Sequence, residues 1–389
     1  MTTRPLTLFR GGLWNRFCMW ICLENDEAPR LALRTLLVIG ITWVPLAVLC
    51  LWNGTAWGTK VTAPFFLDPG DLFRLLVTPP LLLLAERIMD REFGSVVNYF
   101  QSSGIVREED QAAYGRAVDR CQHWMTNMWV EIALLVLLFL TLFFFLDIGE
   151  GFPSTVSNWK RDVATGDPSA ASYYYRYVTS VVYRFLVVRW AWRFFVWSVF
   201  LLKMSRFRLN LHPTHPDSAG GLGILGESQA CFVLLGVALS ANVAGIIARA
   251  VLYEGVTVQS HRFLIGGVVL VLSIIALLPL FAFTAKLTEC KRRGLMLYGC
   301  LAQRYSGLFG NKWLGRSIPD DTDLLGSADI QSLADLAGGY AVVEGMRLFP
   351  MRGKIVPFIV VAIAAPFVPL IFFVYNAQEL LFRILTVLL

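Results

Sequence analysis

The sequence predicts an all-α, polytopic membrane protein with seven transmembrane helices, and three observations support this fold class. The chain has 389 residues, of which 56% are hydrophobic and 16% are charged, so it is more apolar than a soluble domain of this length needs to be. Several apolar stretches approach the roughly 20 residues that a helix needs to cross a bilayer. Lys and Arg are distributed unequally between the two sides that such spans define.

The apolar stretches differ in how clearly they predict a span. A weaker stretch, at about 66–86, has charged residues at its start and is interrupted by Pro79-Pro80. Without it, every later loop would change sides and the charge bias would disappear, so we include it as a span. The other stretches are apolar throughout and lie at about 31–52, 128–148, 177–203, 230–252, 262–285 and 354–376.

The charge bias predicts the orientation of these spans. Lys and Arg number 21 in the segments on the side of the amino terminus, which are residues 1–30, 86–127, 204–229 and 286–354. Far fewer lie on the opposite side. Because positively charged loops stay in the cytoplasm, we expect the amino terminus inside and the carboxyl terminus outside. Residues 1–30 show no signal-peptide pattern and are expected to form a cytoplasmic segment.

The cytoplasmic parts include two loops, 87–127 and 204–229, and one longer segment, 286–353. We expect this segment to form amphipathic helices. Its first part, 286–305, contains Lys291-Arg292-Arg293 and predicts a basic continuation of the sixth span, which an anionic lipid or a protein partner can bind. The remaining residues, 354–389, provide the seventh span and an external carboxyl terminus.

The predicted fourth span contains arginines, which are rare inside a bilayer. Arg184, Arg189 and Arg193 lie in the apolar stretch 177–203. A charge at this depth normally needs a carboxylate, a wet cavity or an anionic substrate beside it. Arg189 and Arg193 are four residues apart and therefore share one helix face, whereas Arg184 points elsewhere. This span is the first candidate functional site.

Acidic residues at matching depths are candidate ion-pair partners for these arginines. We expect Arg193 to pair with Glu86 or Glu131, and Arg184 to pair with Asp71 or Asp147. Arg189 has no obvious partner and would bind an anion or a lipid phosphate. Asn242 of the fifth span would add polar lining to the same path, or would bond to a neighbouring helix. Structural salt bridges throughout are the alternative interpretation.

A loop with two of the four histidines is the second candidate site. His212, His215 and Asp217 have ligand types that hold zinc or another divalent ion. Three glycines of the next turn could instead present backbone amides to an anion. A third interpretation is structural, in which prolines end the helix and Asp217 accepts hydrogen bonds from the glycine turn. The glycines concerned are Gly220, Gly221 and Gly223.

Four short sequence motifs are distributed along the chain between residues 74 and 350. They are "RLLVTPPLLLLAE", "RWAWRFFVW", "LHPTHPDSAGGLGIL" and "ADIQSLADLAGGYAVVEGMRLFP". In these motifs the chain resembles a family of bacterial multi-pass inner-membrane proteins of about this length. The resemblance implies a bacterial inner-membrane location and implies no particular activity.

The leading functional hypothesis is a channel or transporter, for a small anion, with the arginines of the fourth span lining the path. We expect a homo-oligomer in the lipid bilayer, with no cofactor and no nucleic-acid partner. The first alternative is a membrane sensor or scaffold that recruits a cytoplasmic partner. The second is a membrane enzyme that acts at the cytoplasmic surface through the histidine loop.

Overall fold

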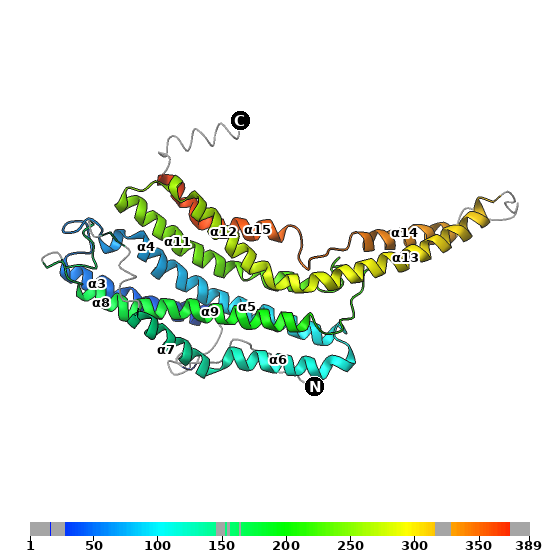
Figure 1. Cartoon of the computed structure of the whole chain (residues 1–389), viewed down its shortest axis with the longest axis horizontal. Helices are drawn as coiled ribbons and strands as arrows, with labels where there is room; N and C mark the ends of the chain where they lie inside the picture. Colours follow the sequence, from blue (N-terminus) through cyan, green and yellow to red (C-terminus); the bar gives the residue numbers. More distant parts are fainter. Residues whose placement is uncertain are drawn as a thin grey trace, which may run out of the picture.

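The computed structural model describes residue 16 and residues 28–144, 152–153, 156–162, 165–315 and 328–373. In this part of the chain the regular structure is helical, with three isolated β-bridges. Figure 1 shows an elongated body of helices that lie lengthwise, and a thinner arm that projects from one end. The fold class is therefore all-α, as the sequence predicts.

The helices follow one another along the chain with short connections. The α-helices are α2 (Ala28–Thr42), α3 (Val44–Asn53), α4 (Pro69–Leu72), α5 (Thr78–Ser102), α6 (Gln111–Thr126), α7 (Met128–Phe144), α8 (Ala170–Tyr174), α9 (Ser180–Met204), α10 (Ile224–Ala230), α11 (Val233–Glu254), α12 (Arg262–Leu277), α13 (Thr284–Trp313), α14 (Ala328–Glu344) and α15 (Ile355–Ala364). Two π-helical segments and several 3-10 turns join neighbouring helices, among them Phe73–Val77 and Tyr175–Thr179.

Helices in the described residues are long and apolar enough to cross a membrane several times. Five pass this test, and a sixth is added if Glu108–Thr126 and Met128–Thr141, which meet at 42°, form one bent span. The five are Leu31–Asn53, Ala170–Met204, Ile224–Glu254, Val258–Trp313 and Ile355–Phe373. The helices thus have the length and apolar composition of a multi-pass membrane protein. A seventh span, over the charged stretch that contains α4, stays a prediction.

The stretch predicted at 66–86 forms part of a longer helical segment. The π-helical turn Phe73–Val77 connects α4 to α5, and α5 continues to Ser102, beyond the predicted end. Pro79 and Pro80 do not interrupt the helix, because they lie in the first turn of α5, where the turn before them has already loosened the regular hydrogen bonding. After residue 86, α5 stays helical because it buries an apolar stripe that includes Met89, Phe93 and Phe100.

The core of the body lies around α9. This helix contacts α5, α6 and α7, and it buries both aromatic and charged side chains. The rings of Trp197 and Phe93 are stacked with their centroids 3.8 Å apart, and the Trp197 indole donates to Gln229 at 3.1 Å. Because α9 is covered on several sides, Arg189 and Arg193 lie inside the protein rather than against lipid.

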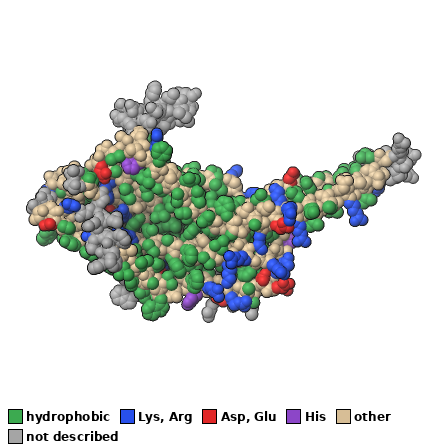
Figure 2. Space-filling model, in the orientation of Figure 1, with side chains coloured by type: hydrophobic (Ala, Val, Ile, Leu, Met, Phe, Trp, Pro, Cys, Tyr) green, Lys and Arg blue, Asp and Glu red, His purple; other side chains and the backbone are tan. Residues whose placement is uncertain are grey.

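An arm formed by α14 and the distal part of α13 projects beyond the body (Figure 1). Helical structure continues from Val258 to Trp313, 56 residues, which is far more than the roughly 20 that a bilayer requires. The expected extension of the sixth span is therefore present as α13. Figure 2 shows a broad apolar surface over the middle of the body and a concentration of Lys and Arg where the arm begins.

Candidate functional site

Two clusters of charged side chains are buried inside the body. The first, which we call the α9 cluster, consists of Glu86, Glu131, Arg189 and Arg193. Arg189 Nε lies 2.8 Å from Glu131 Oε1, and Arg189 Nη2 lies 3.0 Å from Glu86 Oε1. Arg193 Nη1 contacts the same Glu86 oxygen at 2.9 Å. Two guanidinium groups and two carboxylates thus balance each other across α5, α7 and α9.

The expectation that Arg189 lacks a partner is wrong. Arg189 contacts two carboxylates, and it is 2% exposed. The carboxylate of Glu86 bridges Arg189 and Arg193. The pairing predicted from the sequence assigns each acid to one arginine and does not include a shared carboxylate. Glu86 and Glu131 are therefore ion-pair partners, but they serve Arg189 as well as Arg193. The free charge that motivated an anion path at Arg189 is absent.

Two other residues of the predicted path lie apart from the α9 cluster. Arg184 is half-buried on α9 and makes no ion pair with any described residue. Its predicted partner Asp71 is surrounded by other basic side chains, and Asp147 lies outside the described residues. Asn242 accepts a hydrogen bond from Arg74 at 3.1 Å, so it belongs to a different polar cluster than Arg189. The four proposed path residues therefore do not line one site.

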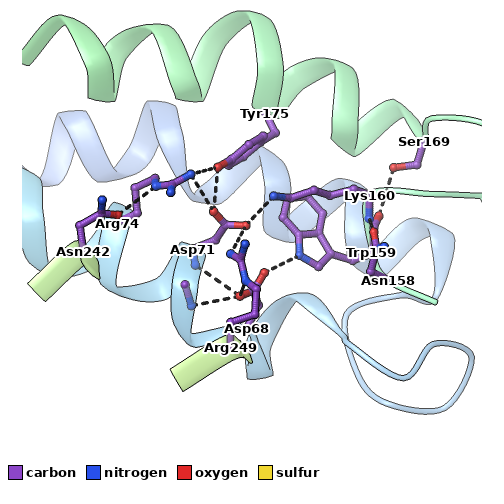
Figure 3. A network of polar contacts seen from close by, with 11 residues as sticks. Asp68, Asp71, Arg74, Asn158, Trp159, Lys160, Ser169, Tyr175, Asn242 and Arg249 are labelled. Carbon is purple, nitrogen blue, oxygen red and sulfur yellow. Dashed lines mark hydrogen bonds and ion pairs between the residues drawn. The ribbon is translucent and has the colours of Figure 1, made fainter. Parts of the chain in front are cut away.

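The second buried cluster, which we call the α4 cluster, consists of Asp68, Asp71, Arg74, Lys160 and Arg249 (Figure 3). Asp71 Oδ2 lies 2.9 Å from Lys160 Nζ and 3.1 Å from Arg249 Nη2, and its Oδ1 lies 3.5 Å from Arg74 Nη1. Asp68 Oδ1 lies 2.7 Å from Arg249 Nε. The two aspartates thus join α4, α11 and the segment that precedes α8.

Neutral side chains complete the α4 cluster. Tyr175 donates to Asp71 Oδ1 at 2.8 Å and also contacts Arg74. The indole of Trp159 donates to Asp68 Oδ2 at 3.1 Å, and the ammonium of Lys160 lies 4.0 Å from the centroid of the Tyr175 ring. Since both carboxylates are buried, these contacts replace the water that the charges lose on folding.

Close approach of the helices makes room for this cluster. A Cβ atom on Gly245 of α11 would lie 2.8 Å from the Pro69 carbonyl oxygen, and a Cβ on Gly70 would lie 2.3 Å from Arg249 Nη2. Side chains at these two positions would separate α4 from α11. The glycines therefore let the guanidinium of Arg249 reach both aspartates.

Sequence reasoning missed most of the α4 cluster. Asp68, Arg74 and Arg249 were visible as charges near the ends of apolar stretches, and Asp71 was assigned to Arg184. Lys160 and Trp159 lie in a connecting segment without helical or strand periodicity. A buried lysine in such a segment leaves no pattern in the sequence, so its contact with Asp71 could not be predicted.

The histidine loop forms a tight turn around the carboxylate of Asp217. Its Oδ1 accepts hydrogen bonds from the amides of Ala219 at 2.7 Å and Gly221 at 3.1 Å, and its Oδ2 accepts one from Gly223 at 2.7 Å. Gly220 and Gly221 have φ angles of +64° and +97°, which favour glycine. The part of the structural interpretation in which Asp217 binds the glycine turn is confirmed. The part in which prolines end the helix is wrong, because α9 ends at Met204, before Pro213.

Two observations argue against the ligand-binding interpretations of this loop. In the part of the chain that the structure describes, His212, His215 and Asp217 do not come together as a group of three side chains that could hold a metal ion. The amides of Gly221 and Gly223 already bind the Asp217 carboxylate and are not available to another anion.

The electrostatics of Asp217 follow from these contacts. His215 Nδ1 lies 2.8 Å from Asp217 Oδ1. Burial alone would raise the pKa of Asp217, but the hydrogen bonds from the amides lower it more, so the pKa lies below the usual aspartate value. The carboxylate thus stays ionised, and it acts as an internal anion that fixes the turn.

A cavity of about 620 Å³ lies beside this turn, between residues 209–213 and the first turns of α13. Its volume is in the range of small-molecule and lipid sites. His212 lines this cavity, whereas His215 and Asp217 do not. Part of segment 286–305, which the sequence predicts to bind a partner, therefore forms one wall of this cavity.

Comparison of the chain with models of protein families, with curated proteins and with solved structures gave no match. The two buried clusters, the cavity and the arm are therefore the features of the chain that bear on its function.

Proposed function

We propose that this chain is a membrane sensor or scaffold of the bacterial inner membrane, with seven spans and with its arm in the cytoplasm. One observation carries the proposal: helical structure from Val258 to Trp313 joins the far end of the body to the arm, with the 3-10 segment Leu278–Phe283 between α12 and α13. The 30 residues of α13 are on the order of 45 Å long at about 1.5 Å per residue. A displacement of α12 in the membrane would reach the arm through this junction.

The distribution of charge supports the cytoplasmic placement of the arm. Lys and Arg gather at the end of the body from which the arm projects (Figure 2). Loops on the cytoplasmic side of a membrane protein carry this excess. The bacterial location rests on the resemblance of the sequence motifs.

The α4 cluster supports the seventh span. The charges at the start of this stretch made it the weakest of the seven, but Asp71 meets Lys160 and Arg249 inside the protein. Charges that are paired in the interior do not face lipid, which removes the main objection to a span there. The helices of this stretch, α4 and α5, also lie lengthwise beside α11 and contact it.

Within one chain α14 packs on α13, and Lys312 Nζ lies 2.5 Å from Asp329 Oδ2. The outer face of this arm supports a homo-oligomer in which α14 of one copy also contacts α13 of the next. Between Thr284 and Trp313, α13 carries six basic residues and one acidic residue, whereas α14 carries three acidic residues and no basic ones. Leu297, Leu301 and Leu308 recur at helical spacing on α13 and are each more than half exposed. The α14 of the same chain supplies an acidic partner to Lys312, whereas a second copy would cover the exposed leucines.

A cross-linking experiment in native membranes tests this assembly. Two differently tagged, cysteine-free chains would be co-expressed, one carrying Leu301→Cys and the other carrying Ile330→Cys on α14. We expect a short bis-maleimide to join the two tags. The matched control is Ser306→Cys, which is also exposed on α13 but faces away from the Leu301 stripe. Equal cross-linking of the two α13 positions, or none from Leu301→Cys, would refute the assembly.

The orientation needs a separate measurement. A membrane-impermeant maleimide is expected to label Ser306→Cys in inside-out vesicles and not in intact cells. Labelling from outside the cell would place the arm on the wrong side and would remove the proposed function. Because labelling does not depend on oligomerisation, the two tests fail independently.

The sequence favoured an anion channel or transporter, mainly because Arg189 was expected to have no ion-pair partner. The ion pairs of Arg189 remove this support. Arg189 and Arg193 are held by carboxylates, so neither presents a free charge to a path through α9. The enzyme hypothesis also loses support, because the carboxylate of Asp217 already accepts hydrogen bonds from backbone amides of its own turn. Flux of chloride, potassium and phosphate through proteoliposomes would restore the channel if Arg189→Gln changed the ion preference.

A further inference from the structure

The cavity beside the histidine loop has walls of two chemical kinds. The basic lining groups are Arg107, Lys286 and Arg293, together with His212, and the one acidic group is Glu289. Three cations against one carboxylate leave an excess of two positive charges while the histidine is neutral. The remaining wall is largely apolar, with Leu209, Leu211, Pro213, Ala285, Leu297 and Tyr298.

The basic side chains of this cavity keep hydrogen-bond donors that can bind a ligand. Arg107 and Arg293 are exposed and make no ion pair with any residue that the structure describes. Glu289 is turned to Arg292, with 2.7 Å between the charged atoms. Lys286 Nζ donates to the Phe207 carbonyl oxygen at 2.5 Å, which holds one of its three donors and fixes the ammonium at the cavity wall.

The position of the cavity matches the surface of a bilayer. It lies at the start of α13, directly after the apolar helix α12 and the 3-10 turn Leu278–Phe283, where the apolar surface of the body gives way to Lys and Arg (Figure 2). Basic pockets between helices at this level suit the headgroups of anionic lipids. A soluble anion would gain nothing from the leucines, whereas an acyl chain would.

We propose that this cavity binds an anionic phospholipid, with its phosphate between Arg107 and Arg293 and its acyl chain along Leu209, Leu211 and Leu297. A phosphodiester carries one negative charge and accepts hydrogen bonds from guanidinium groups, which are suited to phosphate oxygens. The basic side chains of the cavity thus suit the phosphate of a phospholipid, and the apolar side chains suit its acyl chain.

Binding there would couple the lipid to the arm. Cys290 of α13 lines the cavity, and its Sγ lies 3.6 Å from the Leu211 carbonyl oxygen. The next residue, Lys291, lies outside the cavity and donates from Nζ to the Met346 carbonyl oxygen at 3.0 Å. A lipid that joins Arg107 to α13 would therefore hold the base of the arm against the body. This inference goes beyond the proposed function, since the lipid site stands whether or not the arms of two copies associate.

Lipid binding by the full-length purified protein tests the inference. The protein would be placed in phosphatidylcholine nanodiscs with increasing fractions of phosphatidylglycerol, and the retained lipid would be counted by native mass spectrometry. We expect the Arg107→Gln/Arg293→Gln variant to bind phosphatidylglycerol about 30-fold more weakly, because each basic residue near an anionic lipid contributes on the order of 1 kcal/mol. Arg304→Gln, on α13 outside the cavity, is the matched control and should bind like the parent.

A second variant is expected to change lipid affinity in the opposite direction, which misfolding would not do. Glu289→Gln removes the one carboxylate of the cavity, so we expect it to tighten phosphatidylglycerol binding several-fold. Equal binding by the parent and the double-arginine variant, or an equal loss in Arg304→Gln, would overturn the proposal. Displacement of the lipid by inorganic phosphate at matching concentrations would also overturn it, because the site would then recognise a free anion rather than a lipid.

Discussion

The α9 and α4 clusters bury charges of the same kinds in different ways. The α9 cluster takes its four side chains from three helices, and two arginines balance two glutamates. The α4 cluster brings two aspartates to three basic side chains, and one of these, Lys160, comes from a connecting segment. The first cluster therefore joins helices to each other, whereas the second also fastens a loop into the body.

This difference determines how much depends on a single carboxylate. Glu86 contacts two guanidinium groups, but Arg189 keeps a second partner in Glu131. Asp71 contacts Arg74, Lys160 and Arg249. Removal of one partner from a buried ion pair costs roughly 3–5 kcal/mol, because the other charge is left in a medium that solvates it poorly. The α4 cluster should thus be the more sensitive of the two.

The largest expected effect is that of Asp71→Asn. The substitution removes the carboxylate that the buried Lys160 and Arg249 share with the partly buried Arg74, so we expect a loss of about 3–5 kcal/mol in the free energy of unfolding. The loss would be measured as the temperature at which the purified protein leaves the monodisperse peak in size-exclusion chromatography. Asp335→Asn on the exposed face of α14 is the control and should change stability by less than about 0.5 kcal/mol. An unchanged transition for Asp71→Asn would break the comparison.

A smaller effect is expected for Glu86→Gln in the α9 cluster. Arg189 still faces Glu131 in this variant, so we expect a loss of about 2–3 kcal/mol, below that of Asp71→Asn. The contact with Arg193 can be isolated by a double-mutant cycle, in which Arg193→Gln should cost less in the Glu86→Gln background than alone. If Glu86→Gln proved more damaging than Asp71→Asn, the α9 cluster would be the principal anchor of the body.

The same comparison shows what could be predicted from the sequence. The spacing of Arg189 and Arg193 predicts that they share a helix face, and Glu86 and Glu131 were identified as carboxylates at suitable depths. The error lay in assigning one acid to each base. Geometry allows one carboxylate to accept from two guanidinium groups, and sequence spacing contains no information on that sharing.

The α4 cluster shows where sequence reasoning stops. Helical periodicity places residues on faces of one helix, but it does not relate a helix to a loop far along the chain. Lys160 and Asp71 are 2.9 Å apart although 89 residues separate them. The continuation of the sixth span as α13, by contrast, could be predicted because it depends on local pattern alone.

The smallest effect concerns Asp217, whose carboxylate is bound by backbone amides instead of basic side chains. Its pKa is lowered in the folded protein, so it stabilises the fold at pH values above the usual aspartate pKa of about 3.9, and this contribution is lost as the pH falls through the lowered value. Asp217→Asn should therefore cost about 1–2 kcal/mol at neutral pH, the scale of hydrogen bonds to a charged group, and less at acidic pH.

Hydrogen exchange locates this effect. The amides of Ala219, Gly221 and Gly223 donate to Asp217, and Arg347 at the base of the arm contacts its carbonyl oxygen. In Asp217→Asn these amides should exchange faster at neutral pH, while the Trp197 indole in the α9 core stays protected. Equal protection of the turn in both proteins would mean that the glycines alone maintain it. Faster exchange that spread along α14 would instead show that the turn anchors the arm, because Arg347 follows α14 in the chain and binds the same loop.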